Sequence, residues 1–254
     1  MNSKLVETTI SIDNKNKFFL EQIKNSLAKP LKTINGLMTD MESDRRYYVS
    51  LAYPKEHKPQ MNAIISENVA KVISVSYKRQ YLLQKMRLSG DELVVRTLIN
   101  TMCIFDSHID SKTLSDMLGE GENIVIDGVY NFRSKAIKRK WDEIIELSNA
   151  NDLIFSDKEI IKDFLRFLLE AVPIFHKKMY VVLSETGFLL LDAKSKNIPK
   201  QILIYPGLTD EEILMYNIIC QKPRAVVFVG KTEKLSAEFV ELADYLFETS
   251  YENN

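Results

Sequence analysis

The sequence predicts an α+β fold with a mainly helical middle and small mixed β-sheet units contributed by the N- and C-terminal parts. Segments rich in β-branched residues lie near the N-terminus and recur only after Pro173. Between them, apolar residues return every three or four positions, as in helices that face a core. We therefore divide the chain into a β-α-β-β unit (1–55), a helical core (56–173) and a C-terminal α/β unit (174–254). The terminal strands either join into one sheet or form two separate small sheets.

The N-terminal unit is predicted to begin with a strand over residues 5–12. A helix follows, and Pro30 ends it because proline lacks the backbone N–H that another turn requires. Two further strands are predicted over residues 32–41 and 45–53. Asn35-Gly36 is a turn dipeptide, so a tight hairpin at this point is the alternative.

The middle of the chain is predicted to be helical. One long helix covers residues 61–87, and the capping-box pair Ser89 and Glu92 begins the next one. A short helix is predicted over residues 111–118. Residues 124–126 are either a short strand or an extended entry to the two central helices that follow.

The first central helix combines an apolar side with a cluster of positively charged residues near its N-terminus. Ile137, Trp141 and Ile145 recur at helical spacing and place the apolar groups on one side. Positive charge near a helix N-terminus is disfavoured by roughly a few tenths of a kcal/mol per charge, so these residues do not stabilise the helix. They are either a solvated face or a binding patch for an anion or an acidic surface. The residues are Arg133, Lys135, Lys138, Arg139 and Lys140.

The second central helix is predicted to start at Ser156, which forms a capping-box pattern with Glu159. Its apolar residues cover more than half of its circumference, so we expect it to be buried on most sides. They are Ile160, Ile161, Phe164, Leu165, Phe167, Leu168, Leu169 and Val172. Pro173 ends the helix, and the short connection predicts an antiparallel pair with the first central helix.

The C-terminal part returns to strands. Residues 179–184, 188–193 and 201–205 are predicted strands, and a tight turn joins the first two into a hairpin. Thr209 and Glu212 then form a further capping-box pattern at the start of a helix.

The last part of the chain is predicted to hold one strand and one helix. The continuous apolar run over residues 225–229 indicates a central strand. An amphipathic helix over 236–247 follows it. The polar tail beyond Glu248 is predicted to fray.

Four runs of residues occur in an order that resembles the YtxC family, which is associated with sporulation in endospore-forming Firmicutes. The runs are V-Y-N-F-R at 129–133 ahead of the helix with Trp141, F-L-R-F-L-L at 164–169 ahead of a strand, E-I-L-x-x-x-I-I at 212–219, and K-P-R-A-V-V-F at 222–228. The resemblance covers mainly residues 124–229, and the chain has more lysine over 135–140 than the family pattern. It implies a sporulation-associated protein, and it brings no established activity, cofactor or catalytic residue.

The composition limits the classes of protein to which this chain can belong. A chain of 254 residues, 45% hydrophobic and 27% charged, is a globular protein of one large or two small domains. The net charge of −1 argues against a general nucleic-acid binder, which carries a basic excess. Cys103 and Cys220 lie in apolar helix patterns, so we expect reduced thiols. We find no secretory signal pattern and no run of about 18 apolar residues, and we expect a cytoplasmic protein without a membrane span.

Asp106-Ser107-His108-Ile109-Asp110 has the most ligand-like spacing in the chain. Alternating residues of a strand or loop point the same way, so Asp106, His108 and Asp110 would meet one metal there. The same polar run also fits a helix end followed by a cap at Ser111. The segment supplies no second histidine, so we assign no metal and leave this site open.

The sequence Val229-Gly230-Lys231-Thr232 is similar to the last residues of a phosphate-binding loop that follows an apolar strand. The full pattern needs a glycine five residues before Gly230, and that position is Ala225 inside the predicted strand. We therefore read the motif as a strand exit.

These observations lead us to expect a non-enzymatic cytoplasmic protein that acts through protein contacts, with the basic cluster over 133–140 as its contact patch. Acidic residues near the C-terminus offer an internal or intersubunit partner: Glu238, Glu241, Asp244, Glu248 and Glu252. Two alternatives stay open, a nucleic-acid binder using the same cluster and an enzyme whose residues converge only in three dimensions. The sequence assigns no catalytic residue, no cofactor and no oligomeric state.

Overall fold

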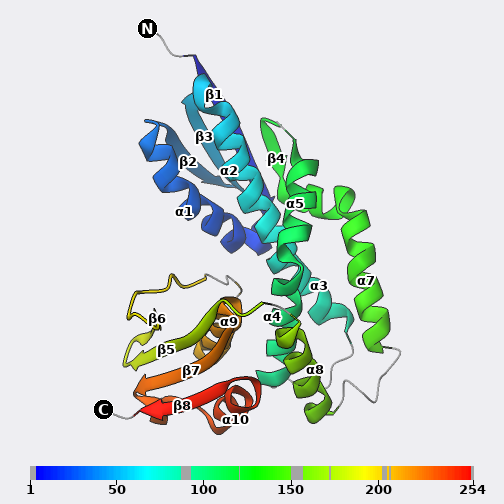
Figure 1. Cartoon of the computed structure of the whole chain (residues 1–254). Coiled ribbons are helices and arrows are strands. Elements are labelled where there is room, and N and C mark those ends of the chain that lie inside the picture. Colours follow the sequence, from blue (N-terminus) through cyan, green and yellow to red (C-terminus); the bar gives the residue numbers. More distant parts are fainter. Residues whose placement is uncertain are drawn as a thin grey trace. The chain divides into compact units, whose positions relative to one another are not determined.

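The computed structural model describes residues 4–86, 93–119, 121–149, 157–171, 173–201, 205 and 207–252. The chain divides into two compact units. Unit 1 contains Met1–Gln84 and Phe105–Ile145, and unit 2 contains Lys85–Ile104 and Glu146–Asn254. Each unit has its own four-stranded sheet (Figure 1), so the predicted α+β class is confirmed. The terminal strands form two sheets, and residues 56–173 contribute helices to both units.

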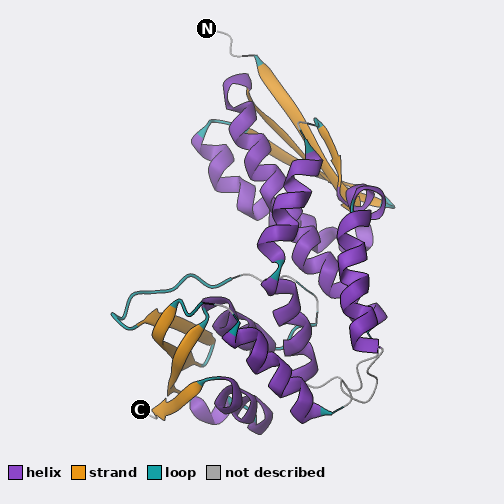
Figure 2. Cartoon of the chain, turned by 45° about the vertical axis from the view of Figure 1, so that its right-hand side comes forward, coloured by secondary structure: helices purple, strands orange, loops and turns teal. Residues whose placement is uncertain are grey.

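The sheet of unit 1 has the strand order β2-β3-β1-β4. Strands β1 (Leu5–Asp13) and β3 (Arg46–Pro54) are antiparallel, and β2 (Leu37–Glu42) pairs with β3. Strand β4 (Asn123–Val125) runs parallel to β1, so residues 124 and 125 are a strand as in the first of the two alternatives, whereas Ile126 begins a short helix. Alternate residues of β3 are buried, and helix α1 (Lys17–Thr33) covers that face and packs in turn against α2 (Lys58–Lys71) (Figure 2).

The first helix differs from the prediction at its C-terminus. Helix α1 (Lys17–Thr33) continues through Pro30, which lies in its last turn. Proline there removes one hydrogen bond, and the burial of Leu31 (2% exposed) holds the turn in place. Asn35 then adopts a left-handed backbone conformation (φ 55°) after the helix. The predicted strand over 32–41 therefore begins only at β2, and the alternative hairpin at Asn35-Gly36 is wrong.

The predicted long helix of unit 1 is present and contains an irregular turn. A 3-10 turn (Lys55–His57) leads into α2 (Lys58–Lys71), a π-helical segment (Val72–Tyr77) and α3 (Lys78–Lys85). The backbone is helical throughout these elements, and the π segment adds a residue to the turn that precedes α3.

The remaining helices of unit 1 lie between residues 107 and 149. Helix α5 (Ser107–Leu118) starts before the predicted Ser111 and ends at Gly119, whose φ is 63°. A short helix α6 (Ile126–Gly128) and a second π segment (Val129–Arg133) lead into α7 (Lys135–Asn149). The predicted apolar side of α7 is confirmed, because Ile137, Trp141 and Ile145 are at most 6% exposed.

The sheet of unit 2 has the strand order β6-β5-β7-β8. Strands β5 (His176–Ser184) and β6 (Gly187–Asp192) form the predicted hairpin, and β7 (Pro223–Gly230) runs parallel to β5 in a central position. The helices of this unit are α4 (Leu93–Phe105), α8 (Lys158–Glu170), α9 (Asp210–Gln221) and α10 (Ala237–Leu246). Thr209 and Glu212 form both hydrogen bonds of the predicted capping box at α9.

The C-terminal tail is a strand, and the prediction that it frays is wrong. Strand β8 (Glu248–Glu252) runs parallel to β7 and forms one edge of the sheet. The Tyr251 ring stacks on Phe228 at a centroid distance of 5.1 Å, and its hydroxyl donates to Asp244. Backbone pairing and this one aromatic contact order a segment whose side chains are mostly polar.

Helix α8 is less buried than its composition predicts. Ile161 and Leu165 are buried, whereas Phe167 is 63% exposed. The apolar circumference of α8 is wider than the face that packs within unit 2, so the expectation of burial on most sides is wrong. Asp157, whose side chain accepts from the Glu159 N–H, is the N-cap.

Some predictions lie outside the described residues. These are the Ser89–Glu92 capping box, the cap at Ser156 and most of the strand over 201–205. The antiparallel pairing of the central helices also stays a prediction, because the connection over 150–156 is not among the described residues.

Candidate functional site

The basic residues predicted to form a binding patch lie on and just before α7. Lys135, Arg139 and Lys140 are exposed, and none of the three forms an ion pair within the described part of the chain. We call these three residues, together with Arg133, the α7 basic patch. The buried side of the helix fixes this orientation, because Ile137 and Trp141 face the core and turn Lys135 and Arg139 toward solvent.

The charges of the patch are unfavourable for the helix that bears them. Positive side chains occupy the N-terminal half of α7, whose exposed N–H groups already carry partial positive charge. Lys135, Arg139 and Lys140 therefore contribute no stability through the helix dipole. A role outside helix stability fits this arrangement better.

An exposed aromatic residue adjoins the patch. Phe132 is 77% exposed at the end of the second π segment, directly before Arg133. Phe132 and Arg133 line a pocket of about 380 Å³ together with residues of the free edge of β4. Sequence reasoning treated the V-Y-N-F-R run as an entry to the helix and missed the exposure of Phe132. An aromatic side chain beside an arginine in a basic turn was the available signal.

Lys138, also predicted as part of the binding cluster, is used within unit 1. Its ammonium lies 3.6 Å from the centroid of the Tyr130 ring, and the Tyr130 ring contacts Tyr77 at 4.5 Å. Burial lowers the pKa of Lys138, and the nearby Asp142 carboxylate partly opposes this shift. Burial likewise raises the pKa of the Tyr130 hydroxyl. The structure thus separates Lys138 from the exposed members of the cluster.

The three residues considered as metal ligands in the sequence, Asp106, His108 and Asp110, lie at the start of helix α5. Asp106 occupies the N-cap position of α5 without a capping hydrogen bond from its side chain, Asp110 follows one turn later on the same side, and His108 is exposed. The two aspartates each place Oδ2 3.6 Å from the ammonium of Lys78. The helix therefore does not bring the three side chains to one point. No group of three His, Cys, Asp or Glu side chains suited to a metal occurs among the described residues.

Lys78 itself is a buried charge that sequence reasoning missed. Its side chain is 0% exposed, and its ammonium makes no hydrogen bond within the described residues. Its ammonium lies 5.9 Å from the ring of Trp141, whose indole N–H donates to Asp110 at 2.9 Å. The two carboxylates and the ring offset the cost of burying this charge. The polar K-R-Q context of Lys78 had the appearance of a solvated helix face.

Gly230 and Lys231 form a strand exit, as the sequence indicates. Gly230 has a φ of 92°, and a Cβ there would lie 2.7 Å from the Leu183 carbonyl oxygen. The ammonium of Lys231 pairs with Glu185. A 3-10 turn (Thr232–Lys234) follows in place of the helix that a phosphate-binding loop requires.

The acidic residues near the C-terminus have partners within unit 2. Glu241 pairs with Lys162 at 2.5 Å, and Glu248 pairs with Arg224 at 2.9 Å. Asp244 accepts hydrogen bonds from the hydroxyls of β8. These carboxylates already form ion pairs or hydrogen bonds, so they are less available to pair with any other basic residue.

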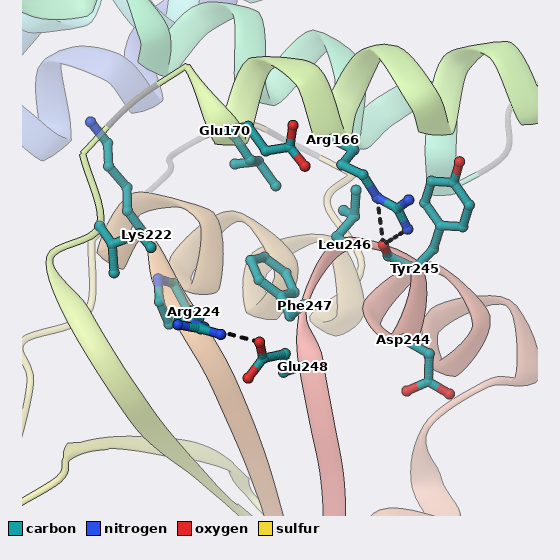
Figure 3. A pocket seen from close by; sticks show the side chains of 12 residues that line it. Arg166, Glu170, Lys222, Arg224, Asp244, Tyr245, Leu246, Phe247 and Glu248 are labelled. Carbon is teal, nitrogen blue, oxygen red and sulfur yellow. Dashed lines mark hydrogen bonds and ion pairs between the residues drawn. The ribbon is translucent and has the colours of Figure 1, made fainter.

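A second pocket lies at the end of unit 2 where β7 and β8 begin (Figure 3). It has a volume of about 450 Å³ and collects the C-terminal ends of α8, α9 and α10. Arg166 donates from Nε to the Tyr245 carbonyl at 3.1 Å, and Arg224 pairs with Glu248. Helix C-termini carry partial negative charge, so basic residues are favoured there.

Comparisons with known proteins identify no relative: no family model, no curated protein and no solved structure matches the chain. In the described part of the chain, no helix has the length and apolar character needed to cross a membrane.

Proposed function

We propose that this protein is a non-enzymatic, sporulation-associated protein that works in the cytoplasm through contacts with an acidic protein partner at the α7 basic patch. The observation behind this proposal is the set of exposed cations at Lys135, Arg139 and Lys140, which form no ion pair among the described residues, together with the exposed Phe132 beside Arg133. The sporulation and cytoplasmic assignments derive from the resemblance to the YtxC family and from the sequence pattern.

The physical argument concerns what such a surface recognises. Unpaired cations attract an acidic surface over about one Debye length, roughly 8 Å at physiological salt, and raise the rate of encounter. An exposed aromatic ring contributes a favourable free energy of burial only when a partner covers it. Arg133 is part of the pocket beside Phe132, so charge and apolar area lie together.

Nucleic acid is the alternative ligand for the same surface, because cations and an aromatic ring also suit phosphates and bases. The alternatives differ in their measurable behaviour. Binding to nucleic acid is removed by nuclease and weakens steeply with salt in proportion to the phosphates contacted.

The test is a pulldown from nuclease-treated extracts of a sporulating host. We compare the wild-type chain with the triple variant Lys135→Glu, Arg139→Glu and Lys140→Glu, and with Phe132→Ser. The matched control reverses three exposed lysines elsewhere in unit 1: Lys29, Lys32 and Lys71. We expect the α7 variants to lose the partner and to lower spore yield, and the control to retain both.

Three outcomes would contradict parts of the proposal. An unchanged set of partners in the triple variant removes the α7 patch from protein contacts. Loss of every captured protein after nuclease treatment of the wild type assigns the patch to nucleic acid. A normal spore yield in a strain that lacks the gene would reject the link to sporulation.

A further inference from the structure

Unit 2 exposes an apolar tip at the start of β5. Ile174 is 57% exposed and Phe175 is 64% exposed, and the two are adjacent in sequence. The Phe175 N–H donates to the Lys222 carbonyl at 3.1 Å, so the backbone holds this tip beside the start of β7. More than half of each residue is exposed, at a position that this backbone contact holds.

Lysines surround this apolar tip. Lys177 and Lys178 follow it on β5 and are exposed, and Lys222 places its ammonium 4.8 Å from the centroid of the Phe175 ring. None of these three lysines has an acidic partner among the residues that the structure describes. Lys177 and Lys178 are adjacent in sequence, and the parallel register of β5 and β7 brings Lys222, directly before β7, to the same end of the sheet.

The 450 Å³ pocket opens beside the tip and is lined in part by Ile174 and Lys222 (Figure 3). Most of its other charges are engaged: Arg166 with the Tyr245 carbonyl, and Arg224 with Glu248. Asp244 accepts from the hydroxyls of Thr249 and Tyr251. Glu170 and Lys222 are the remaining charged residues of the lining. The exposed Lys177 and Lys178 of β5 lie outside the lining and make the net charge of this corner positive.

We propose that this corner of unit 2 binds the surface of an anionic lipid membrane, with Ile174 and Phe175 entering the interface and the lysines contacting lipid phosphates. Bulky apolar residues ringed by lysines suit the boundary between headgroups and acyl chains, where both parts are satisfied at once. Each lysine near an anionic leaflet adds a favourable term that salt screens. This site is independent of the α7 basic patch.

An acidic protein is the competing occupant, and the apolar residues distinguish the two. A membrane takes up the exposed tip because its interface is deformable and apolar below the headgroups. A purely electrostatic contact with an acidic protein would depend on the lysines and not on Ile174 and Phe175.

The test uses the full chain and vesicles of phosphatidylcholine, with or without about one third phosphatidylglycerol, in a co-sedimentation assay. We expect partitioning to the anionic vesicles that decreases between about 0.1 M and 1 M salt, where the Debye length falls from roughly 10 Å to 3 Å. Successive strand residues point to opposite faces, so the pair Lys177→Gln and Lys178→Gln should weaken partitioning at least about fivefold, the loss expected for one membrane-facing lysine. The pair Ile174→Ser and Phe175→Ser should weaken it at least about tenfold.

Matched controls are available in the same unit. Lys194→Gln with Lys196→Gln makes the same change in net charge on exposed residues after β6, and Leu189→Ser removes a 41% exposed apolar residue. Both should bind as the wild type does. In Phe175→Trp, the added indole should give blue-shifted emission with anionic vesicles beyond the signal of Trp141. No binding by the wild type, binding that the serine pair retains, or equal losses in the controls would each overturn the proposal.

Discussion

The cluster around Lys78 allows a quantitative test of how unit 1 is stabilised. Replacing Asp110 by Leu removes a carboxylate that is 3% exposed and 3.6 Å from the Lys78 ammonium. It also leaves the Trp141 indole N–H, now 2.9 Å from Asp110 Oδ2, without that acceptor. Breaking a buried ion pair by removing one partner typically costs about 3–5 kcal/mol, a large share of the roughly 5–15 kcal/mol that holds a domain folded. We expect a loss in that range for Asp110→Leu.

Removing both the Lys78 and the Asp110 charge should lower the free energy of unfolding by less than removing either charge alone. In the double variant Lys78→Met and Asp110→Leu, no buried ammonium lacks a partner, and the remaining cost is the unpaired indole N–H, about 1–3 kcal/mol. The structure thus predicts a favourable coupling energy between Lys78 and Asp110 of at least about 2 kcal/mol in a double-mutant cycle.

Urea unfolding followed by tryptophan fluorescence measures these free energies. Trp141 is the single tryptophan of the chain and lies inside the cluster, so its emission reports on unit 1. Lys112→Met, at an exposed position of α5, is the control and should change stability by less than about 0.5 kcal/mol. Additivity of the two single variants within about 0.5 kcal/mol would refute the view that Lys78 and Asp110 depend on each other.

Three further predictions concern unit 2. Gly230→Ala should lower its unfolding free energy by more than about 1 kcal/mol, measured by urea denaturation, because φ is 92° and the new Cβ would meet a carbonyl of β5. Thr209→Ala should cost about 1 kcal/mol, since the hydroxyl accepts from the Glu212 N–H; an unchanged midpoint would reject a stabilising cap. The ammonium of Lys231 holds the pKa of Glu185 below its ordinary value of 4.5. The contribution of this pair is therefore present above that value and decreases as pH falls through the lowered pKa; an NMR titration should show the midpoint rise in Lys231→Gln.

Elements with local signals were predicted well. The Thr209 and Glu212 pattern needs only four consecutive residues, and both of its hydrogen bonds are present. The apolar run of β7 could be assigned to a central strand because a strand covered on both faces has few polar residues. Similarly, the spacing of Ile137 and Trp141 determined which side of α7 faces the core.

The errors occur where a distant partner decides the outcome. Strand β8 has a polar sequence, and it is ordered by pairing with β7 and by the contact of Tyr251 with Phe228. Pro30 remains inside α1 because Leu31 is buried, which helix propensity does not encode. Phe167 is exposed because burial depends on which elements cover α8, and composition gives only the apolar area available.

The candidate sites show the same division. A run of lysines and arginines in sequence identified the α7 basic patch, and exposure of Lys135 and Arg139 follows from the helical period. The same run could not reveal that Lys138 packs on Tyr130, because that contact depends on the π segment before α7. Most of the apolar and basic corner of unit 2 is contiguous at residues 174–178, and only the addition of Lys222 requires the register between β5 and β7.

Two surfaces combine exposed apolar residues with cations that form no ion pair in the described part of the chain, and they coexist with a net charge of −1. Near neutrality therefore does not mean that the surface is electrostatically uniform, because many carboxylates, such as Glu241 and Glu185, are paired with lysines of their own unit. The two proposals can consequently be separated within one molecule. Charge reversal at Lys135, Arg139 and Lys140 should remove the protein partner and leave vesicle binding unchanged. Serine at positions 174 and 175 should do the reverse, and loss of both activities in either variant would show that the two surfaces do not act independently.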